Sequence, residues 1–201
     1  MRFAWSADLG GQAHCRSPEY SIFKPLKAEQ PDFFLLLGDT IYADGKCPTD
    51  LKAKELVEYR AKHAYNRADT PYQEALASTS LLVTWDDHEV VNNFSGPTEP
   101  LMPIGRQAFF EYFPITHEYE PRNIKVGRRR YNDDLPLDIP LPSDPNRMYR
   151  SFRWGRQLEV FVLDLRQYRS SNNDVDGPNK TMLGPAQRAW LKAGLKNSTA
   201  T

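Results

Sequence analysis

The chain has few of the features that would place it in a membrane or in a disulfide-rich scaffold. Its longest apolar run, Phe33 to Leu37, falls far short of the roughly 18 residues of a membrane-spanning helix. Only two cysteines are present, Cys15 and Cys47, which is too few for a disulfide framework. Both are interpreted as ordinary buried thiols, with a disulfide formed in an oxidising compartment or a metal-binding cysteine as the alternatives. Met1 leads straight into a strand-like segment, so no signal peptide is predicted, and the compartment is left open.

The chain also lacks an excess of charge of either sign, because 26 Lys and Arg residues balance 26 Asp and Glu residues. This balance gives no indication of a nucleic-acid partner or of an anionic membrane surface. The one basic run, Arg128-Arg129-Arg130, is interpreted as a solvated loop, with a contact to substrate or partner as the alternative. The oligomeric state is left open.

Several catalytic signatures are absent as well. The sequence contains no Gly-x-Ser-x-Gly elbow, no phosphate-binding P-loop, no Cys-x-x-Cys pair and no His-Glu-x-x-His helix. Gly10-Gly11 is followed by no third glycine at dinucleotide spacing. These absences argue against serine hydrolases, P-loop enzymes, common zinc sites and dinucleotide binding.

With 201 residues, the chain can form one domain with a substantial core. Strands are predicted at residues 2–6, 33–37, 81–85 and 158–164, the last paired in a hairpin with 149–154. The runs 33–37 and 81–85 are continuously apolar, which predicts strands buried on both faces. Helices are predicted at 17–28, 50–65, from 70 onward, 106–113 and 185–195. This alternation favours a layered α/β fold with a largely parallel central sheet, and residues 114–148 are predicted to form a long excursion beside a substrate mouth.

Polar side chains follow each of the first three predicted strands: Asp8, Asp39, Tyr42, Asp87, His88 and Asn93. Ligands bind beyond the carboxyl ends of strands in open α/β sheets, so these side chains are expected to share one crevice. Clustered carboxylates repel one another unless a cation neutralises them, which predicts a metal site. Taken singly, Asp8 could be a turn residue, Tyr42 a packed aromatic and His88 a core histidine; the joint pattern favours the metal site. Asp39, which follows Gly38, is the candidate to bridge two metals.

Six segments share the order of a known family: residues 3–12 (FAWSADLGGQ), 37–42 (LGDTIY), 84–93 (TWDDHEVVNN), 149–155 (YRSFRWG), 163–169 (LDLRQYR) and 183–191 (LGPAQRAWL). With these segments the sequence resembles the PhoD-like alkaline phosphatases and phosphodiesterases, which have the calcineurin-like metallophosphoesterase fold. The resemblance implies a layered β-sandwich flanked by helices, with residues 1–201 as the N-terminal part of a single domain. It also implies iron and calcium as cofactors, with manganese or zinc as alternatives, and a phosphate ester as substrate.

The resemblance implies a role for each matching side chain. Asp39 and Tyr42 correspond to the Gly-Asp-x-x-Tyr ligands, with the phenolate on ferric iron, and Asp8 occupies the place of the first-strand ligand, where many members have cysteine. Asp87 and Asn93 of the third segment are assigned to metal.

Two further residues are assigned to the reaction itself. His88, also from the third segment, is assigned to catalysis. Arg166 is predicted to contact phosphate, and an ion pair with Asp164 is the alternative.

A later Gly-Asp-x-His type motif, which completes the metal site in the family, has no match before Thr201. We therefore expect an incomplete, C-terminally truncated member whose sheet exposes an edge and apolar surface. The predicted function is hydrolysis of phosphate mono- or diesters by a metal-bound hydroxide; the alternative is an incomplete fragment or pseudo-enzyme that only binds metal or phosphate. A third hypothesis is a glycan- or partner-binding sandwich that uses Tyr112, Phe113, Tyr119 and Tyr131. Members of the family are often exported.

Overall fold

The computed structural model describes residues 1–10, 15–16, 18–49, 51–115 and 146–200. In these ranges the strands are β1 (Phe3–Ser6), β2 (Phe33–Leu37), β3 (Ser80–Thr84), β4 (Arg150–Trp154) and β5 (Leu158–Val162). The helices are η1 (Ser21–Phe23), α1 (Lys24–Glu29), α2 (Leu56–Arg67), α3 (Thr70–Ser78), η2 (Gly96–Thr98), α4 (Met102–Tyr112) and α5 (Gly184–Asn197). β1, β2 and β3 form a parallel sheet in that order, and β4 and β5 form an antiparallel hairpin.

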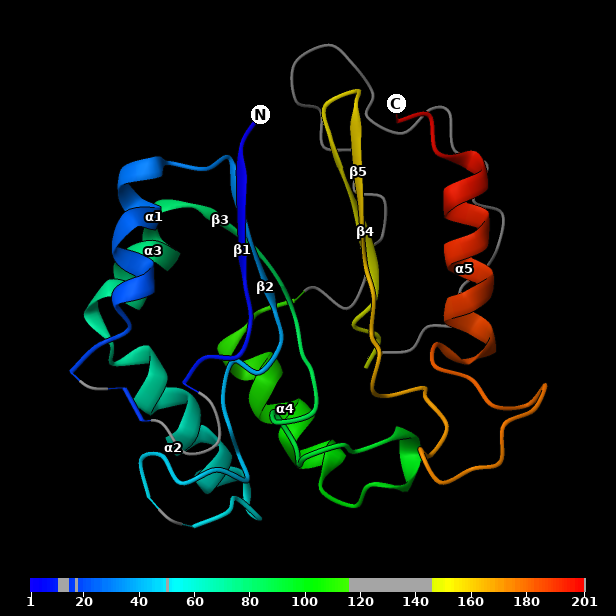
Figure 1. The fold of residues 1–201 in the computed structure, drawn as a ribbon, viewed down its shortest axis with the longest axis horizontal. Helices are drawn as coiled ribbons and strands as arrows, with labels where there is room; N and C mark the ends of the chain where they lie inside the picture. The colour runs from blue at the N-terminus through cyan, green and yellow to red at the C-terminus, as the bar shows by residue number, and fades with distance from the viewer. Residues whose placement is uncertain (11–14, 17, 50, 116–145, 201) are drawn as a thin grey trace.

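The elements are arranged in layers (Figure 1). Helices α1, α2 and α3 lie on one side of the parallel sheet, the hairpin lies on the other side, and α5 lies beyond the hairpin. Aromatic contacts connect the layers: the ring centroids of Phe33 and Trp154 are 5.2 Å apart, and those of Phe161 and Trp190 are 5.7 Å apart. The protein is therefore a mixed α/β structure with a small parallel sheet, as predicted.

The sheet is buried most deeply at its central strand, β2. Phe33, Phe34 and Leu36 are almost inaccessible to solvent, which confirms the prediction of a strand buried on both faces. β1 is an edge strand of this sheet, and its Phe3 and Trp5 keep 48% and 68% of their surface exposed. The β1 edge thus exposes apolar side chains, as expected for the sheet.

The carboxyl ends of the three parallel strands converge at one edge of the sheet. Just past β2, Gly38 has φ +101°, and a Cβ atom at this position would lie 2.6 Å from both Cβ and N of Asp86. Only glycine allows so close an approach in this backbone conformation. Gly38 therefore brings the segment after β2, which carries Asp39, against the segment after β3.

Several predicted helix starts need correction. Residues 17–28 do not form one helix: a short 3-10 turn starts at Ser21 and α1 starts at Lys24. α2 starts at Leu56, because Glu55 and Glu58 form a capping box there; the expected cap, Asp50, lies outside the described residues. α4 starts at Met102 rather than Arg106, because its proline fits the first turn of a helix. The predicted strands agree with the observed ones to within one or two residues.

The interpretation of Cys15 and Cys47 as ordinary thiols is wrong, because the two residues form a disulfide. Their Cα atoms are 5.4 Å apart, within the range that a disulfide requires. The loops after β1 and β2 leave the sheet at the same edge, and this brings together two cysteines that are 32 residues apart in sequence. The disulfide therefore ties together the two loops that follow Asp8 and Tyr42.

The glycan-binding hypothesis gains no support from the aromatic residues that the structure describes. Phe113 is buried in the core, and the ring of Tyr112 stacks on that of His63 at 4.7 Å between centroids. Tyr119, Tyr131, the run Arg128-Arg129-Arg130 and most of the predicted excursion 114–148 lie outside the described residues.

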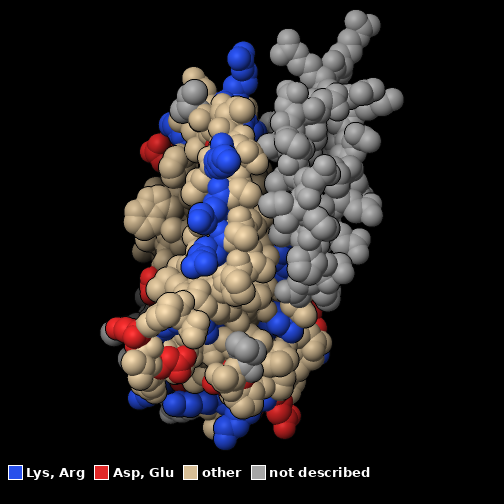
Figure 2. All heavy atoms as spheres, turned by 90° about the vertical axis from the view of Figure 1, so that its right-hand side faces the viewer, with Lys and Arg blue, Asp and Glu red and all other residues tan. Residues whose placement is uncertain are grey.

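Figure 2 shows a column of basic side chains over α5. The exposed cations of this helix are Arg188, Lys192 and Lys196, and the helix contains no Asp or Glu. α5 thus gives a local positive face to a chain without net charge. Within the described ranges, no helix combines the length and apolarity that crossing a bilayer requires.

Candidate metal centre

A cluster of three buried side chains lies at the carboxyl ends of β2 and β3. Asp39, Asp87 and His88 each offer one ligand atom, and these atoms lie within 4.8 Å of one another. Two ligands on opposite sides of one cation are about 4–5 Å apart, since metal–oxygen distances are about 2.0–2.6 Å. The geometry of the cluster therefore fits a cation held between the three groups.

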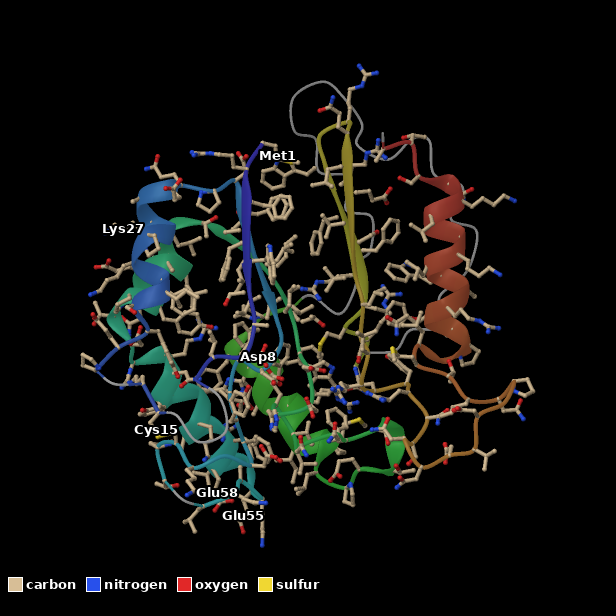
Figure 3. All side chains as sticks on the ribbon, viewed as in Figure 1. Met1, Asp8, Cys15, Lys27, Glu55 and Glu58 are labelled. Carbon is tan, nitrogen blue, oxygen red and sulfur yellow. A yellow bond between two sulfur atoms is a disulfide. The ribbon has the colours of Figure 1, made fainter. Side chains whose placement is uncertain are left out.

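Tyr42 connects Asp8 to this cluster. Its phenol donates a hydrogen bond of 3.3 Å to Oδ1 of Asp8, and its ring stacks on that of His88 with 4.4 Å between centroids. Figure 3 shows Asp8 at the opposite end of β1 from Met1. The structure thus brings the predicted ligands of all three strands to one end of the sheet, with Asp8 exposed at the rim.

Asn93 meets the cluster through its backbone. Its N–H donates a short hydrogen bond to Oδ2 of Asp87, and the residue is exposed. This bond fixes the orientation of the Asp87 carboxylate.

The alternative interpretation of Arg166, an ion pair with Asp164, is wrong. The guanidinium of Arg166 instead contacts Oδ1 of Asp86 through Nε at 2.5 Å and Oδ1 of Asp87 through Nη2 at 3.2 Å. Asp164 is fully buried and accepts the backbone N–H of Arg166 and the indole N–H of Trp85, both at 3.0 Å. Asp164 therefore anchors the segment that carries Arg166, while the arginine side chain reaches the cluster.

The backbone is unusual at the same residues. Outside glycine, the described residues with left-handed φ are Asp8 (59°), Gln30 (46°), Asp39 (50°) and Asn93 (60°). Such conformations cost an L-residue roughly 1–2 kcal/mol and concentrate at functional sites. Three of these four residues are predicted metal ligands, so the unfavourable backbone is concentrated at the candidate site.

Glu89 is a structural residue of the site to which sequence analysis gave no role. It is fully buried, and its carboxylate accepts the backbone N–H groups of Asp39 at 3.2 Å, Thr40 at 2.6 Å and Asp86 at 2.8 Å, and the Thr40 hydroxyl at 2.7 Å. One side chain thereby holds the segment after β2 to the segment after β3. Its position directly after Asp87-His88 was the only signal in the sequence.

Asp44 is a second residue that sequence analysis missed. Its Oδ1 lies 2.7 Å from Nδ1 of His88, and its Oδ2 accepts the backbone N–H of Asn92 at 2.8 Å. An acidic residue two positions after Tyr42 was visible in the sequence, but nothing there indicated that it would meet His88.

The electrostatics of the cluster fit a cation. Burial and the charge of Glu89 raise the pKa of Asp39 to about 8, and burial raises the pKa of Glu89 itself to about 7. Burial and the charges of Asp39 and Asp8 also raise the pKa of the Tyr42 phenol. A cation in the cluster would favour the ionised forms of the carboxyl groups. Carboxylate, phenol and imidazole donors suit iron, calcium, manganese or zinc.

Comparison with known proteins points to one family. A family model described as PhoD-like phosphatase matches residues 3–201. Alkaline phosphatase D of Bacillus subtilis (strain 168) is 32% identical over 216 residues, an alignment that covers 94% of this chain and 35% of that protein. A solved structure described as the structure of PhoD superimposes with a TM-score of 0.69 at 27% identity, covering 99% of this chain and 39% of that one. The chain thus spans 35–39% of the length of these relatives.

Proposed function

Because the chain belongs to the PhoD-like phosphatase family, we propose that its strand-end cluster takes part in metal-dependent hydrolysis of phosphate monoesters or diesters. The observation that carries this proposal is the buried group of Asp39, Asp87 and His88, whose ligand atoms lie within 4.8 Å of one another. Such a group, next to the guanidinium of Arg166, combines a cation site with a positive side chain for phosphate.

In this proposal Asp39 would be the carboxylate shared between the metals. Tyr42, Asp8, Asp87 and Asn93 would be the further residues that hold the metals, and iron and calcium are the proposed metals, with manganese or zinc as alternatives. When bound, the metals would supply Lewis acidity toward phosphate and would lower the pKa of a water molecule. The side chains around the cluster would hold the phosphate ester in the orientation that attack by this water molecule requires.

Arg166 and His88 are the residues proposed to act on the substrate. Nη1 of Arg166 is buried without a hydrogen-bond partner among the described residues, while its Nε and Nη2 contact Asp86 and Asp87. A phosphate oxygen would satisfy Nη1 with a charge-assisted hydrogen bond. His88, stacked on Tyr42, would transfer a proton at the leaving oxygen.

The test is hydrolysis of para-nitrophenyl phosphate and of its bis ester at mildly alkaline pH. Iron, calcium, manganese or zinc is added to protein from which a chelator has first removed all metal. We expect metal-dependent turnover that Asp39→Asn abolishes. Asp32→Asn is the matched control, because Asp32 is exposed and binds the backbone N–H of Arg2 before β2, at the other end of the sheet. Turnover without metal, or turnover unchanged in Asp39→Asn, would refute the proposal.

The alternative function is binding of metal and phosphate without turnover. The observation in its favour is that the cluster in the described residues has three closely spaced ligands, whereas calcium takes about 6–8 oxygen ligands. Titration calorimetry separates the two functions. Phosphate binding that requires metal, in a folded chain that hydrolyses neither ester, would establish the alternative.

A further inference from the structure

We propose that a cavity beside β3 binds an amphipathic anion, a small molecule with a carboxylate or phosphate head on an apolar body. The cavity has a volume of about 400 Å³, and small-molecule sites in proteins measure about 300–1,000 Å³. Its lining, as far as the structure describes it, includes no residue of the candidate metal centre. The cavity is therefore a separate site, and the inference does not rest on the proposed function.

The walls of the cavity are mostly apolar or aromatic. They come from β3, from the last turns of α2, α3 and α4, and from the segment that leads into β4. Leu76 of α3, Leu81 of β3 and Phe152 of β4 line it and are only half-buried. An apolar ligand body in the cavity would remove more of their surface from water, which favours binding.

Three arginines line the same cavity: Arg67, Arg147 and Arg150. Within the described ranges none of them forms an ion pair, and the lining contains no Asp or Glu. The guanidinium of Arg147 lies 5.4 Å from the ring centroid of Tyr149, and that of Arg67 lies 4.5 Å from the ring centroid of Phe113. Aromatic rings therefore hold these cations in place, and no acid of the described chain neutralises them.

Arg150 is the most strongly desolvated of the three cations. Its Nη1 donates to the carbonyl of Met148 at 2.8 Å, and its Nη2 donates to the carbonyl of Val83 at 2.6 Å. Burial lowers the pKa of Arg150 to about 10, because the charged form loses its hydration. A guanidinium has five N–H donors, so these two bonds leave others for an anion. Burial of a cation costs free energy unless an opposite charge compensates for it.

The two halves of the cavity together define the ligand. Arginine pairs with carboxylates and phosphates through two parallel hydrogen bonds, and the apolar walls suit a hydrocarbon or aromatic body. Small-molecule sites combine a mainly apolar lining with a few polar groups that fix the orientation of the ligand. The cavity also gives a role to the segment YRSFRWG, because Tyr149, Arg150 and Phe152 line it and the metal centre uses none of them.

The first test is titration calorimetry of the metal-free chain with four compounds. Octanoate and octylphosphonate carry the proposed heads on an apolar tail, and a phosphonate is not hydrolysed as a phosphate ester is. Octylammonium has the same tail with a positive head, and acetate has the head without the tail. We expect both amphipathic anions to bind and the other two compounds to bind at least 10-fold more weakly; the tighter anion identifies the preferred head. Equal affinity for octylammonium would overturn the proposal. So would a failure of both anions to bind, the result expected if another segment of the chain fills the cavity.

The second test locates the bound anion. Arg147→Met keeps an apolar side chain and removes the charge, so octanoate should bind about 10- to 100-fold more weakly. Arg188→Met is the matched control, because Arg188 is exposed on α5 and lies outside the lining. It should leave the affinity unchanged. An affinity that falls equally in both variants, or in neither, would contradict the proposal.

A methyl NMR spectrum of the unaltered chain gives the same answer without any variant. Octanoate should shift the methyl signals of Leu76, Leu81 and Val83, which line the cavity. The signals of Leu165, next to Arg166, and of the exposed Val175 should stay in place. Shifts at Leu165 without shifts at Leu81 would place the anion at the metal centre and would refute the assignment to this cavity.

Discussion

Replacement of Gly38 by alanine should destabilise the fold by roughly 2–5 kcal/mol and should weaken metal binding. The backbone at Gly38 has φ +101°, and an added Cβ would lie 2.6 Å from Cβ and N of Asp86 and 2.9 Å from the carbonyl carbon of Trp85. The left-handed conformation costs an L-residue roughly 1–2 kcal/mol, and overpacking against fixed neighbours costs roughly a further 1–3 kcal/mol. Relief of this clash would separate the segments after β2 and β3 that carry Asp39 and Asp87.

The chain offers two matched controls for this substitution. Gly155 also has a left-handed backbone, with φ +61°, but a Cβ there would meet nothing within 4 Å, so Gly155→Ala should show the backbone cost alone. Gly177 has open space and no left-handed φ, so Gly177→Ala should be neutral or slightly stabilising. The difference between Gly38→Ala and Gly155→Ala isolates the contact between the two strand ends.

The measurement is urea unfolding of the four chains, each with chelator and with added metal. We expect the midpoints to fall in the order Gly177→Ala, Gly155→Ala, Gly38→Ala, and the stabilisation by metal to be smallest in Gly38→Ala. A Gly38→Ala chain that loses no more stability than Gly155→Ala would show that the segments after β2 and β3 are not in tight contact.

Three further perturbations test other parts of the structure. Folded Asp39 and Glu89, with pKa values of about 8 and 7, hold protons that the unfolded chain releases near the ordinary pKa values of 3.8 and 4.5. The thermal midpoint of the chelated chain should therefore fall as pH rises from about 4 to 8. Added metal should raise that midpoint more at pH 8 than at pH 5. A midpoint that rises with pH in the presence of chelator would contradict the raised pKa values of Asp39 and Glu89. Replacing Cys15 and Cys47 by serine should lower the free energy of unfolding in urea by about 3–4 kcal/mol, the value for a closed loop of this length; a midpoint equal to that of the oxidised chain would contradict stabilisation by the disulfide. Asp69→Ala should cost about 1–3 kcal/mol in the same assay, because the Asp69 carboxylate caps α3 and also accepts a backbone N–H from the segment before η1.

The parallel strands and the order of the site segments were predictable because their signals are local. β2 is an uninterrupted apolar run, and the Gly-Asp-x-x-Tyr motif follows it directly, so both the strand and the position of Asp39 can be read from neighbouring residues. Parallel strands bring their carboxyl ends to one edge, which was enough to predict that Asp39 and Asp87 meet.

The contacts that were not predicted depend on the path of loops. Asp44 and His88 are 44 residues apart, the disulfide joins residues 32 apart, and Arg166 meets Asp86 across 80 residues. The spacing of apolar residues along the sequence does not predict such pairs, because the direction of a loop side chain is set only when the loop folds. From the sequence, an ion pair with the neighbouring Asp164 was the alternative to a phosphate contact of Arg166. In the folded chain the guanidinium of Arg166 contacts Asp86 and Asp87 in the segment after β3.

The carboxyl ends of β1, β2 and β3 contain features that oppose folding when no ligand is bound. Asp8, Asp39 and Asn93 have left-handed backbone, and the buried Asp39 and Glu89 carboxyl groups resist ionisation. Turns that served only to connect strands with helices would require neither the acids nor their burial. Features of this kind persist where the surrounding structure holds them, and here the hydrogen bonds of Glu89 and the close contact at Gly38 do so without metal. A cation would contribute most where buried acids repel one another, so the least favourable region of the chain is the region that metal binding would stabilise most.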